Sequence, residues 1–164
     1  TVKAVNYSCV QQENTAGMFN LPGSFQTYGL LQLDWQKDGA SVTIPVQGTA
    51  GEALRLDLAQ DSTSAANGQR DLSLSVTVTS PQGKTATVTF PEGTAPLRHQ
   101  AGEAVSYDNW DGTVTQFYST FTPLGSLLIA ESQLNGIQLE DVQSVTLNFT
   151  GDSGTIMLRQ IAVQ

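Results

Sequence analysis

Residues 72–79 read LSLSVTVT, and this stretch decides the fold class. Apolar residues alternate with Ser and Thr, which is the period of a β-strand with one face buried and the other in water. Residues 80–83, SPQG, have Pro and Gly where a type I turn prefers them. Residues 85–90, TATVTF, then alternate again. The segment therefore predicts an antiparallel hairpin with one wet face.

The same alternation recurs along most of the chain. It predicts further strands at residues 31–35, 42–46, 54–58, 114–121, 145–149 and 155–163. Helical periodicity is nearly absent, and a single helical turn is expected around residues 132–134. Many short strands with one wet face predict an all-β fold, an antiparallel β-sandwich. No linker divides residues 1–164, so one domain is expected.

Three features interrupt the predicted strands. Residues 60–70 and 91–111 are expected to be loops, long enough to suggest a functional role. The sequence GDSG at residues 151–154 is expected to be a turn between two strands. In the last strand the apolar phase slips between Leu158 and Ile161, which predicts a β-bulge there.

Charge is scarce in this sequence, and this excludes several classes of partner. Charged residues make up 13% of the chain, whereas about 25% is usual. Seven basic and fifteen acidic residues give a net charge of −8. Nucleic acids and anionic membranes both attract clustered Lys and Arg, so neither is an expected partner. No apolar run approaches the roughly 20 residues of a transmembrane helix.

Ser, Thr and Gln supply the polar surface in place of Lys. Their hydroxyls and amides occupy the outward positions of alternating strands, most plainly at residues 73–79 and 85–89, where they can hydrogen-bond to neutral polyols. This composition favours a secreted, extracellular protein. The chain begins TVKAVNYSCV without the features of a signal peptide, so we expect a module of a larger secreted protein. Cys9 is the single cysteine, and an internal disulfide is excluded.

The C-terminal third resembles the end of a β-jelly-roll of the galactose-binding-like class, which includes many carbohydrate-binding modules. The likeness is carried by residues 127–149, with GIQL and VQSVTLNF, and by the closing strand GTIMLRQIAV at residues 154–163. Residues 54–88 look like the sandwich domain that follows the hydrolase domain in some secreted bacterial α/β-hydrolases. The resemblance implies a jelly-roll, a glycan or polysaccharide ligand and an attached catalytic domain as partner.

The resemblance also bears on a structural calcium ion. Jelly-roll modules of this class often hold calcium with an acidic residue of the closing strand, whereas this chain has Arg159 and Gln160 there. Backbone carbonyls and a carboxylate of the N-terminal stretch, such as Glu13, are the remaining candidate ligands. Calcium is thus an expectation without an identified ligand set, and no other cofactor is implied.

Residues 107–112, YDNWDG, form the segment that best matches a sugar-binding site. Sugar recognition is favoured by an aromatic platform for the apolar face of a pyranose and by polar groups that bond its hydroxyls. Trp110 and Tyr107 are the aromatic candidates. Asp108, Asn109 and Asp111 are the polar candidates. The alternative is that Trp110 caps one end of the sandwich and that the acids are solvated.

Two further residues join the candidate ligand-binding set. Tyr118 lies in the predicted strand 114–121 and would display an aromatic ring if its face is concave. Arg55 projects away from the apolar face of its strand, and together with Asp57 it forms either a surface ion pair or part of a polar binding face. Trp35 keeps the apolar phase of its own strand and is predicted to be core.

Catalytic interpretations find less support in the residues. Ser153 in GDSG needs a general base, and the single histidine, His99, is expected in an exposed loop. Two carboxylates can hydrolyse a glycoside when they flank the scissile bond, but short spacing within one loop rarely places them so. The candidate pairs are Asp108 with Asp111 and Asp57 with Asp61.

The sequence thus predicts a non-catalytic carbohydrate-binding module that targets an attached hydrolase to a glycan by aromatic stacking and hydrogen bonds. Two alternatives stay open. The first is an interdomain or assembly sandwich module of a secreted enzyme that binds no sugar. The second, less favoured, is a small glycan hydrolase that uses surface carboxylates.

Overall fold

The computed structural model describes residues 1–11, 24–100, 103–119 and 124–164, and side chains at residues 1–5, 29–100, 108–114 and 124–164. The strands are β1 (Val2–Gln11), β2 (Ser24–Trp35), β3 (Ser41–Pro45), β4 (Ala53–Gln60), β5 (Leu74–Thr79), β6 (Thr85–Phe90), β7 (Glu103–Asp108), β8 (Val114–Ser119), β9 (Gly125–Ala130), β10 (Ser144–Phe149) and β11 (Gly154–Val163). Short 3₁₀ turns connect some of them: η1 (Ala65–Asn67), η2 (Ala95–Leu97), η3 (Glu131–Gln133) and η4 (Leu139–Asp141). None of the helices in the described ranges is long and apolar enough to cross a membrane.

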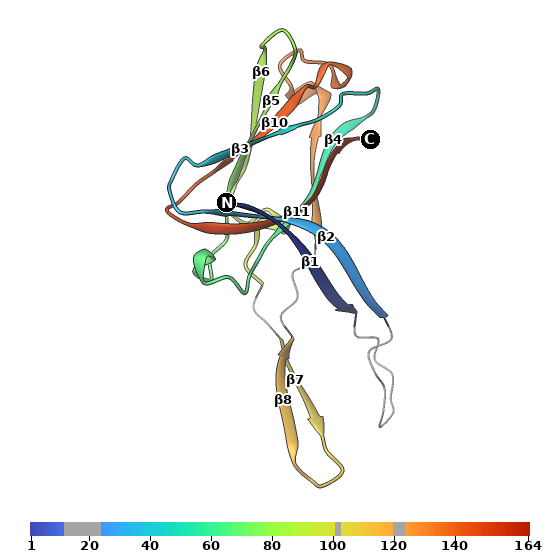
Figure 1. The fold of residues 1–164 in the computed structure, drawn as a ribbon, viewed down its shortest axis with the longest axis vertical. Coiled ribbons are helices and arrows are strands. Elements are labelled where there is room, and N and C mark those ends of the chain that lie inside the picture. Colours follow the sequence, from blue (N-terminus) through green and yellow to red (C-terminus); the bar gives the residue numbers. More distant parts are fainter. Residues whose placement is uncertain (12–23, 101–102, 120–123) are drawn as a thin grey trace.

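Two antiparallel sheets face each other as the layers of a sandwich (Figure 1). One has the strand order β1-β2-β11-β4-β9 and the other has the order β3-β10-β5-β6. From β2 to β11 the chain passes from one sheet to another at nearly every connection, and the β5–β6 and β7–β8 hairpins are the connections that stay within one sheet. This wrapping is the jelly-roll arrangement. The predicted all-β antiparallel sandwich is therefore confirmed.

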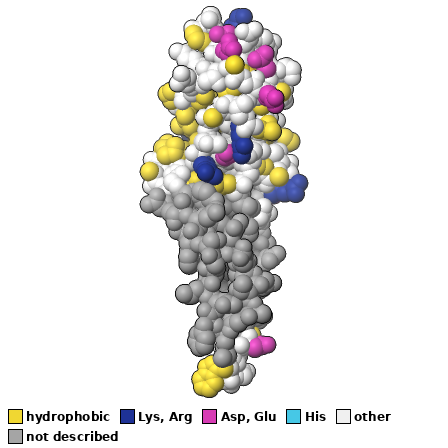
Figure 2. All heavy atoms as spheres, turned by 90° about the vertical axis from the view of Figure 1, so that its right-hand side faces the viewer, with side chains coloured by type: hydrophobic (Ala, Val, Ile, Leu, Met, Phe, Trp, Pro, Cys, Tyr) yellow, Lys and Arg dark blue, Asp and Glu magenta, His cyan; other side chains and the backbone are white. Residues whose placement is uncertain are grey.

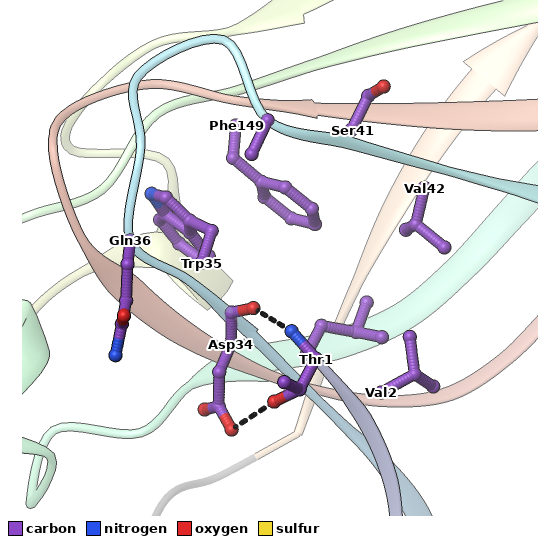
Figure 3. A pocket seen from close by; sticks show the side chains of 10 residues that line it. Thr1, Val2, Asp34, Trp35, Gln36, Ser41, Val42 and Phe149 are labelled. Carbon is purple, nitrogen blue, oxygen red and sulfur yellow. Dashed lines mark hydrogen bonds between the residues drawn. The ribbon is translucent and has the colours of Figure 1, made fainter.

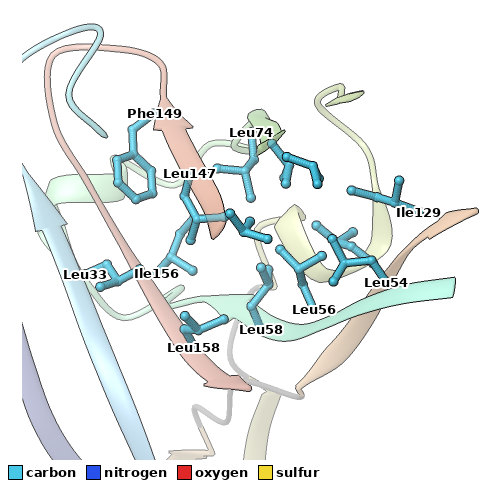
Figure 4. Packing of buried hydrophobic residues seen from close by; sticks show 14 of the residues in the cluster. Leu33, Leu54, Leu56, Leu58, Leu74, Ile129, Leu147, Phe149, Ile156 and Leu158 are labelled. Carbon is cyan, nitrogen blue, oxygen red and sulfur yellow. The ribbon is translucent and has the colours of Figure 1, made fainter. Parts of the chain in front are cut away.

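The core lies between the two sheets, where alternate side chains of each strand meet (Figure 4). In β5, Leu74, Val76 and Val78 are completely buried, whereas the Ser and Thr residues between them are half-buried. Burying one such aliphatic side chain stabilises a fold by about 1.5–3 kcal/mol. The period of two that is visible in the sequence is therefore the direct cause of the layered core.

Several local predictions are confirmed by the pairing of the strands. The register between β11 and β4 shifts between Leu158 and Gln160, so the bulge lies where the apolar phase slips. The turn at residues 151–154 connects β10 to β11, and the single helical turn near residue 132 is η3. These features come from local sequence signals and need no knowledge of the tertiary fold.

The prediction of a continuous loop at residues 91–111 is wrong. Part of it is strand β7, which pairs with β8 along its whole length. These two strands form a sheet of their own, and Figure 1 shows their hairpin projecting from one end of the sandwich. The sequence of β7, EAVSYD, alternates poorly because a two-stranded ribbon lacks a second layer to bury one of its faces.

Candidate ligand-binding site

The segment singled out by its sequence forms the tip of the β7–β8 hairpin. Asp108 ends β7 opposite Val114 of β8. The chain then reverses in a tight turn, in which the Gly112 N–H donates to the Asn109 carbonyl at 3.0 Å. Gly112 has φ of +79°, a left-handed conformation in which glycine meets little steric penalty. The terminal Gly of the motif is thus explained by the backbone of the turn.

Side chains of the turn hold it in one conformation. The Asp111 carboxylate accepts the Thr113 backbone N–H at 2.9 Å and the Thr113 hydroxyl at 2.6 Å. The Asn109 amide donates to the same hydroxyl at 2.9 Å. The two bonds from Thr113 hold the pKa of Asp111 below its usual value. Asp111 is therefore an ionised structural residue of the turn as well as a candidate ligand contact.

Trp110 points into solvent from this turn and is 92% exposed. Figure 2 shows hydrophobic side-chain atoms at the end of the molecule that the hairpin tip forms. The alternative interpretation, in which Trp110 caps the sandwich, is wrong because a cap is covered by the strands beneath it. A tryptophan ring that is exposed to this extent is accessible to a ligand or partner, which an aromatic platform requires.

The two tyrosines of the predicted site also belong to the hairpin. Tyr107 is paired with Thr115 next to the tip, and Tyr118 is paired with Ala104 near the other end of the hairpin. Their side chains lie outside the part of the chain whose side chains are described. The structure thus brings Tyr107 close to Trp110 along the backbone and places Tyr118 farther from the tip.

Arg55 is not part of this tip, since it lies on β4 in the outer face of the five-stranded sheet. Its guanidinium Nε donates to Asp57 at 2.7 Å, and one Nη donates to the Gln164 side chain at 3.1 Å. Asp57 also accepts the Ser126 hydroxyl and the Gln160 amide, both at 2.6 Å. Arg55 and Asp57 therefore form an ion pair, as one of the two alternatives left by the sequence predicted, but the Asp57 carboxylate is buried rather than at the surface.

The environment of Asp57 keeps it ionised. Burial by itself raises its pKa, but the hydrogen bonds from Ser126, Arg55 and Gln160 outweigh burial and leave the pKa below its usual value. A glycosidase acid requires the opposite shift, a raised pKa. Asp61 accepts the N–H and hydroxyl of Thr63 at 2.9 and 2.6 Å, as Asp111 does with Thr113. These carboxylates are explained by structural roles.

Ser153 has a structural partner as well. Its hydroxyl donates to the Ala66 carbonyl at 3.0 Å, which ties the β10–β11 turn to η1. The Asn67 side chain adds to this contact, because its amide oxygen accepts the Thr155 N–H at 2.7 Å and its nitrogen donates to the Thr155 carbonyl at 3.0 Å. The GDSG sequence therefore forms the turn between β10 and β11 that was predicted from the sequence.

The closing strand, β11, carries no carboxylate side chain that could bind calcium. Gln160 directs its amide nitrogen, a hydrogen-bond donor, toward Asp57, and Arg159 is a cation. Within the described residues no group of three or more His, Cys, Asp or Glu side chains is placed to hold a metal ion. Glu13, the carboxylate proposed from the sequence, lies outside the described residues.

A cavity of about 360 Å³ opens at one edge of the sandwich, beside β2 and β3 (Figure 3). At its back Trp35 stacks on Phe149, with ring centroids 4.4 Å apart and planes inclined by 11°. Trp35 is only 4% exposed and its indole N–H donates to the Gly151 carbonyl at 3.2 Å. The prediction that Trp35 belongs to the core is confirmed, and its ring presents little surface to a ligand.

Sequence reasoning did not assemble one further polar surface, on the outer face of the four-stranded sheet. Residues 74–79 and 85–90 were predicted to form a hairpin, but the sequence did not show which strands lie beside that hairpin in the sheet. The pairing places Thr43, Thr146 and Asn148 in the same polar face. The alternation at residues 41–45 and 144–149 was the available signal, although only the sheet order shows that the four strands are adjacent.

No protein-family model and no curated protein matches this sequence significantly. The class of protein therefore rests on its own geometry, which is an antiparallel β-sandwich of jelly-roll topology with an exposed tryptophan at the tip of a projecting hairpin.

Proposed function

We propose that this protein is a non-catalytic carbohydrate-binding module of the galactose-binding-like jelly-roll type, secreted as part of a larger enzyme. The observation that carries this proposal is the indole of Trp110, which is almost completely exposed on a turn fixed by hydrogen bonds. An aromatic ring held in this way offers a flat apolar platform, and the apolar face of a pyranose is a complementary ligand.

The surroundings of Trp110 supply the polar part of such a site. Asp108 is exposed, so its carboxylate can accept hydrogen bonds from sugar hydroxyls. Asn109 is half-buried and donates to Thr113, so it contributes by fixing the turn next to Trp110. Because hydrogen bonds of Thr113 already fix the turn, its backbone loses little conformational entropy when a sugar binds. The site therefore favours retention of a glycan and leaves its chemistry to an attached hydrolase, whose local concentration at the substrate rises.

One observation favours a second candidate function, an interdomain docking module. The hairpin projects from the sandwich, and tryptophan is the residue most enriched where one protein anchors in a pocket of another (Figure 1). In this case Trp110 would enter an apolar pocket of the neighbouring domain. Glycan binding is preferred because the residues next to Trp110 in the chain, Asp108, Asn109 and Asp111, are polar or charged, whereas the centre of a docking anchor is usually depleted of charge.

Affinity electrophoresis in gels that contain soluble polysaccharides tests the proposal. We expect the wild-type chain to be retarded by at least one neutral polysaccharide, and Trp110→Ala to lose this retardation. Val114→Ala is the matched control, since Val114 is also exposed on this hairpin (57%) but is not an aromatic platform. A wild-type chain that migrates freely in every gel would contradict glycan binding and leave the docking function as the better account.

A further inference from the structure

Strands β3, β10, β5 and β6 form the four-stranded sheet (Figure 1). The pairing of these strands places hydroxyl and amide side chains of its outer face in rows that cross all four of them. Neighbouring strands are about 4.8 Å apart, so a row spans about 14 Å. All positions of the rows except Pro45 are Ser, Thr or Asn. The rows are Thr43, Thr146, Thr77 and Thr87; Ser41, Asn148, Ser75 and Thr89; and Pro45, Ser144, Thr79 and Thr85.

Hydrogen bonds within the face fix the orientation of many of these side chains. A hydroxyl has one donor and two acceptor sites, so a bonded pair still offers one O–H and several lone pairs to the solvent side. The face is thus a regular array that both donates and accepts. The bonded groups are Thr43 with Thr146 (2.8 Å), Thr77 with Thr87 (2.9 Å), Ser75 with Thr89 (2.9 Å), and the Asn148 amide with Thr77 (3.1 Å).

The chemistry of this face restricts its ligand. None of the side chains in these rows of the described strands is charged or aromatic, although a solvated surface usually carries about 25–35% charged residues. Without Lys or Arg the face does not attract phosphates, and without Trp, Tyr or Arg it lacks the anchors of a protein interface. An uncharged ligand rich in hydroxyls matches it in both charge and hydrogen bonding.

The size of the face indicates an extended form of that ligand. A single hydrogen bond between neutral groups contributes little net free energy in water, because each group exchanges it for one with water. A ligand must therefore engage several rows and strands at once, which one sugar ring cannot do. Chains ordered side by side, as in an insoluble polysaccharide, repeat their hydroxyls over such an area.

We propose that this face, defined by the three rows above, is a second binding surface that adsorbs the protein to ordered, neutral polysaccharide. The inference rests on the proposed function and adds to it, because it names ordered, neutral polysaccharide as the class of ligand, in addition to the sugar contact at Trp110. Trp110 lies in the turn of the β7–β8 sheet, whereas the three rows lie in the four-stranded sheet. Substitutions can therefore alter one surface without changing the other.

Adsorption to insoluble polysaccharides tests this inference. Depletion isotherms of the complete chain are measured on microcrystalline cellulose, insoluble mannan and granular starch. The test variant combines Thr77→Val, Thr87→Val and Thr146→Val, which removes hydroxyls but keeps branched side chains that favour strands. The matched control combines the three Thr→Ser changes at the same positions, which keep the hydroxyls and lose the methyl groups.

We expect the wild-type chain to adsorb to at least one of the polymers. The triple Val variant should bind at least about tenfold more weakly, since several hydrogen bonds to the polymer are lost together. The triple Ser variant should stay within about threefold of wild type. If the triple Val variant unfolds, Thr87→Val alone, at an exposed position of edge strand β6, should still weaken adsorption measurably while Thr87→Ser does not.

Three results would overturn the inference: no adsorption of the wild-type chain, equal adsorption of the Val variant, or equal losses in the Val and Ser variants. Failure of the proposed function looks different. If soluble polysaccharides retard the chain in a Trp110-dependent way but no insoluble polymer adsorbs it, only the second surface is wrong. If no polysaccharide in either form binds, both proposals fail.

Discussion

The two tryptophans of this chain occupy opposite environments. Trp35 ends β2 inside the sandwich, where it stacks on Phe149 and is 4% exposed, whereas Trp110 stands on the hairpin tip and is 92% exposed. Their sequence contexts already differ. Trp35 continues an apolar alternation, while Trp110 lies among turn residues that end in Gly112. The same side chain thus stabilises one region and is left available for binding in the other.

The number of layers in each region explains this difference. In the sandwich an inward side chain meets neighbours from its own sheet and from the opposite sheet, so a large ring can be buried. The β7–β8 ribbon is a separate two-stranded sheet, and two strands alone cannot enclose a ring. Burial of Trp110 therefore requires a partner or ligand from outside this ribbon.

The largest contrast is expected from truncation of each tryptophan. Trp35→Ala removes a buried ring and should lower the free energy of unfolding by about 3–5 kcal/mol. Trp110→Ala removes an exposed ring and should change it by less than about 0.5 kcal/mol. Urea unfolding monitored by far-UV circular dichroism measures both. A comparable loss of stability in the two variants would show that the hairpin tip is packed and would remove the contrast.

Substitution of two glycines also compares the packed region around Trp35 with the exposed hairpin tip. A Cβ at Gly154 would overlap the ring of Trp35, which packs directly over the backbone there. Gly154→Ala should therefore lower the free energy of unfolding by about 3 kcal/mol. A Cβ at Gly112 would meet no atom within 4 Å, and Gly112→Ala should cost about 1 kcal/mol through its positive φ alone.

The Gly154→Ala variant should also perturb near-ultraviolet circular dichroism, because the Trp35–Phe149 stack must shift. Gly112→Ala leaves that signal unchanged. Thermal unfolding of both variants beside wild type gives the energetic comparison. If the two substitutions lowered the free energy of unfolding equally, or if Gly154→Ala left the aromatic signal unchanged, Trp35 would be less tightly packed than the structure shows.

A smaller effect is expected at Asp57, whose pKa is lowered in the folded protein. A lowered pKa stabilises the fold above the unfolded value of about 3.9, and this contribution is lost as pH falls through the folded value. Asp57→Asn should therefore cost about 2 kcal/mol at pH 7. The difference from wild type should shrink below about pH 4. Melting temperatures from pH 7 to pH 2.5 measure this, and a difference independent of pH would contradict the assignment.

Much of the sandwich could be predicted from alternation alone, because each strand of a two-layer fold has one buried face. Residues 85–90 were predicted with the bounds that β6 has. The order of the strands could not be obtained in this way, since it depends on pairing between distant segments. For this reason the side-by-side placement of Thr43 with Thr146 was missed, although each was visible as an outward residue.

The candidate site was only partly predictable. The aromatic and polar residue types of residues 107–112 singled out this segment as a candidate site, but the sequence analysis did not predict that it forms the tip of a hairpin. The strand before it was missed, since the sequence of β7, EAVSYD, shows no clear alternation of apolar and polar residues. Arg55 was included because its proximity to Asp57 in the sequence left a binding role open. The hydrogen bonds that Asp57 accepts from Ser126 and Gln160 could not be foreseen from residue spacing, because these residues are distant in the sequence.

Tryptophan emission during a glycan titration tests the central claim, that Trp110 is the ligand platform. Using a neutral polysaccharide that retards the wild-type chain, we predict a blue shift of emission and protection from acrylamide quenching, because an exposed indole becomes covered. Trp35 is already buried and should contribute little. In Trp110→Phe the spectral response should vanish. A response that persists in Trp110→Phe, or glycan binding that leaves the emission of the wild-type chain unchanged, would contradict the account.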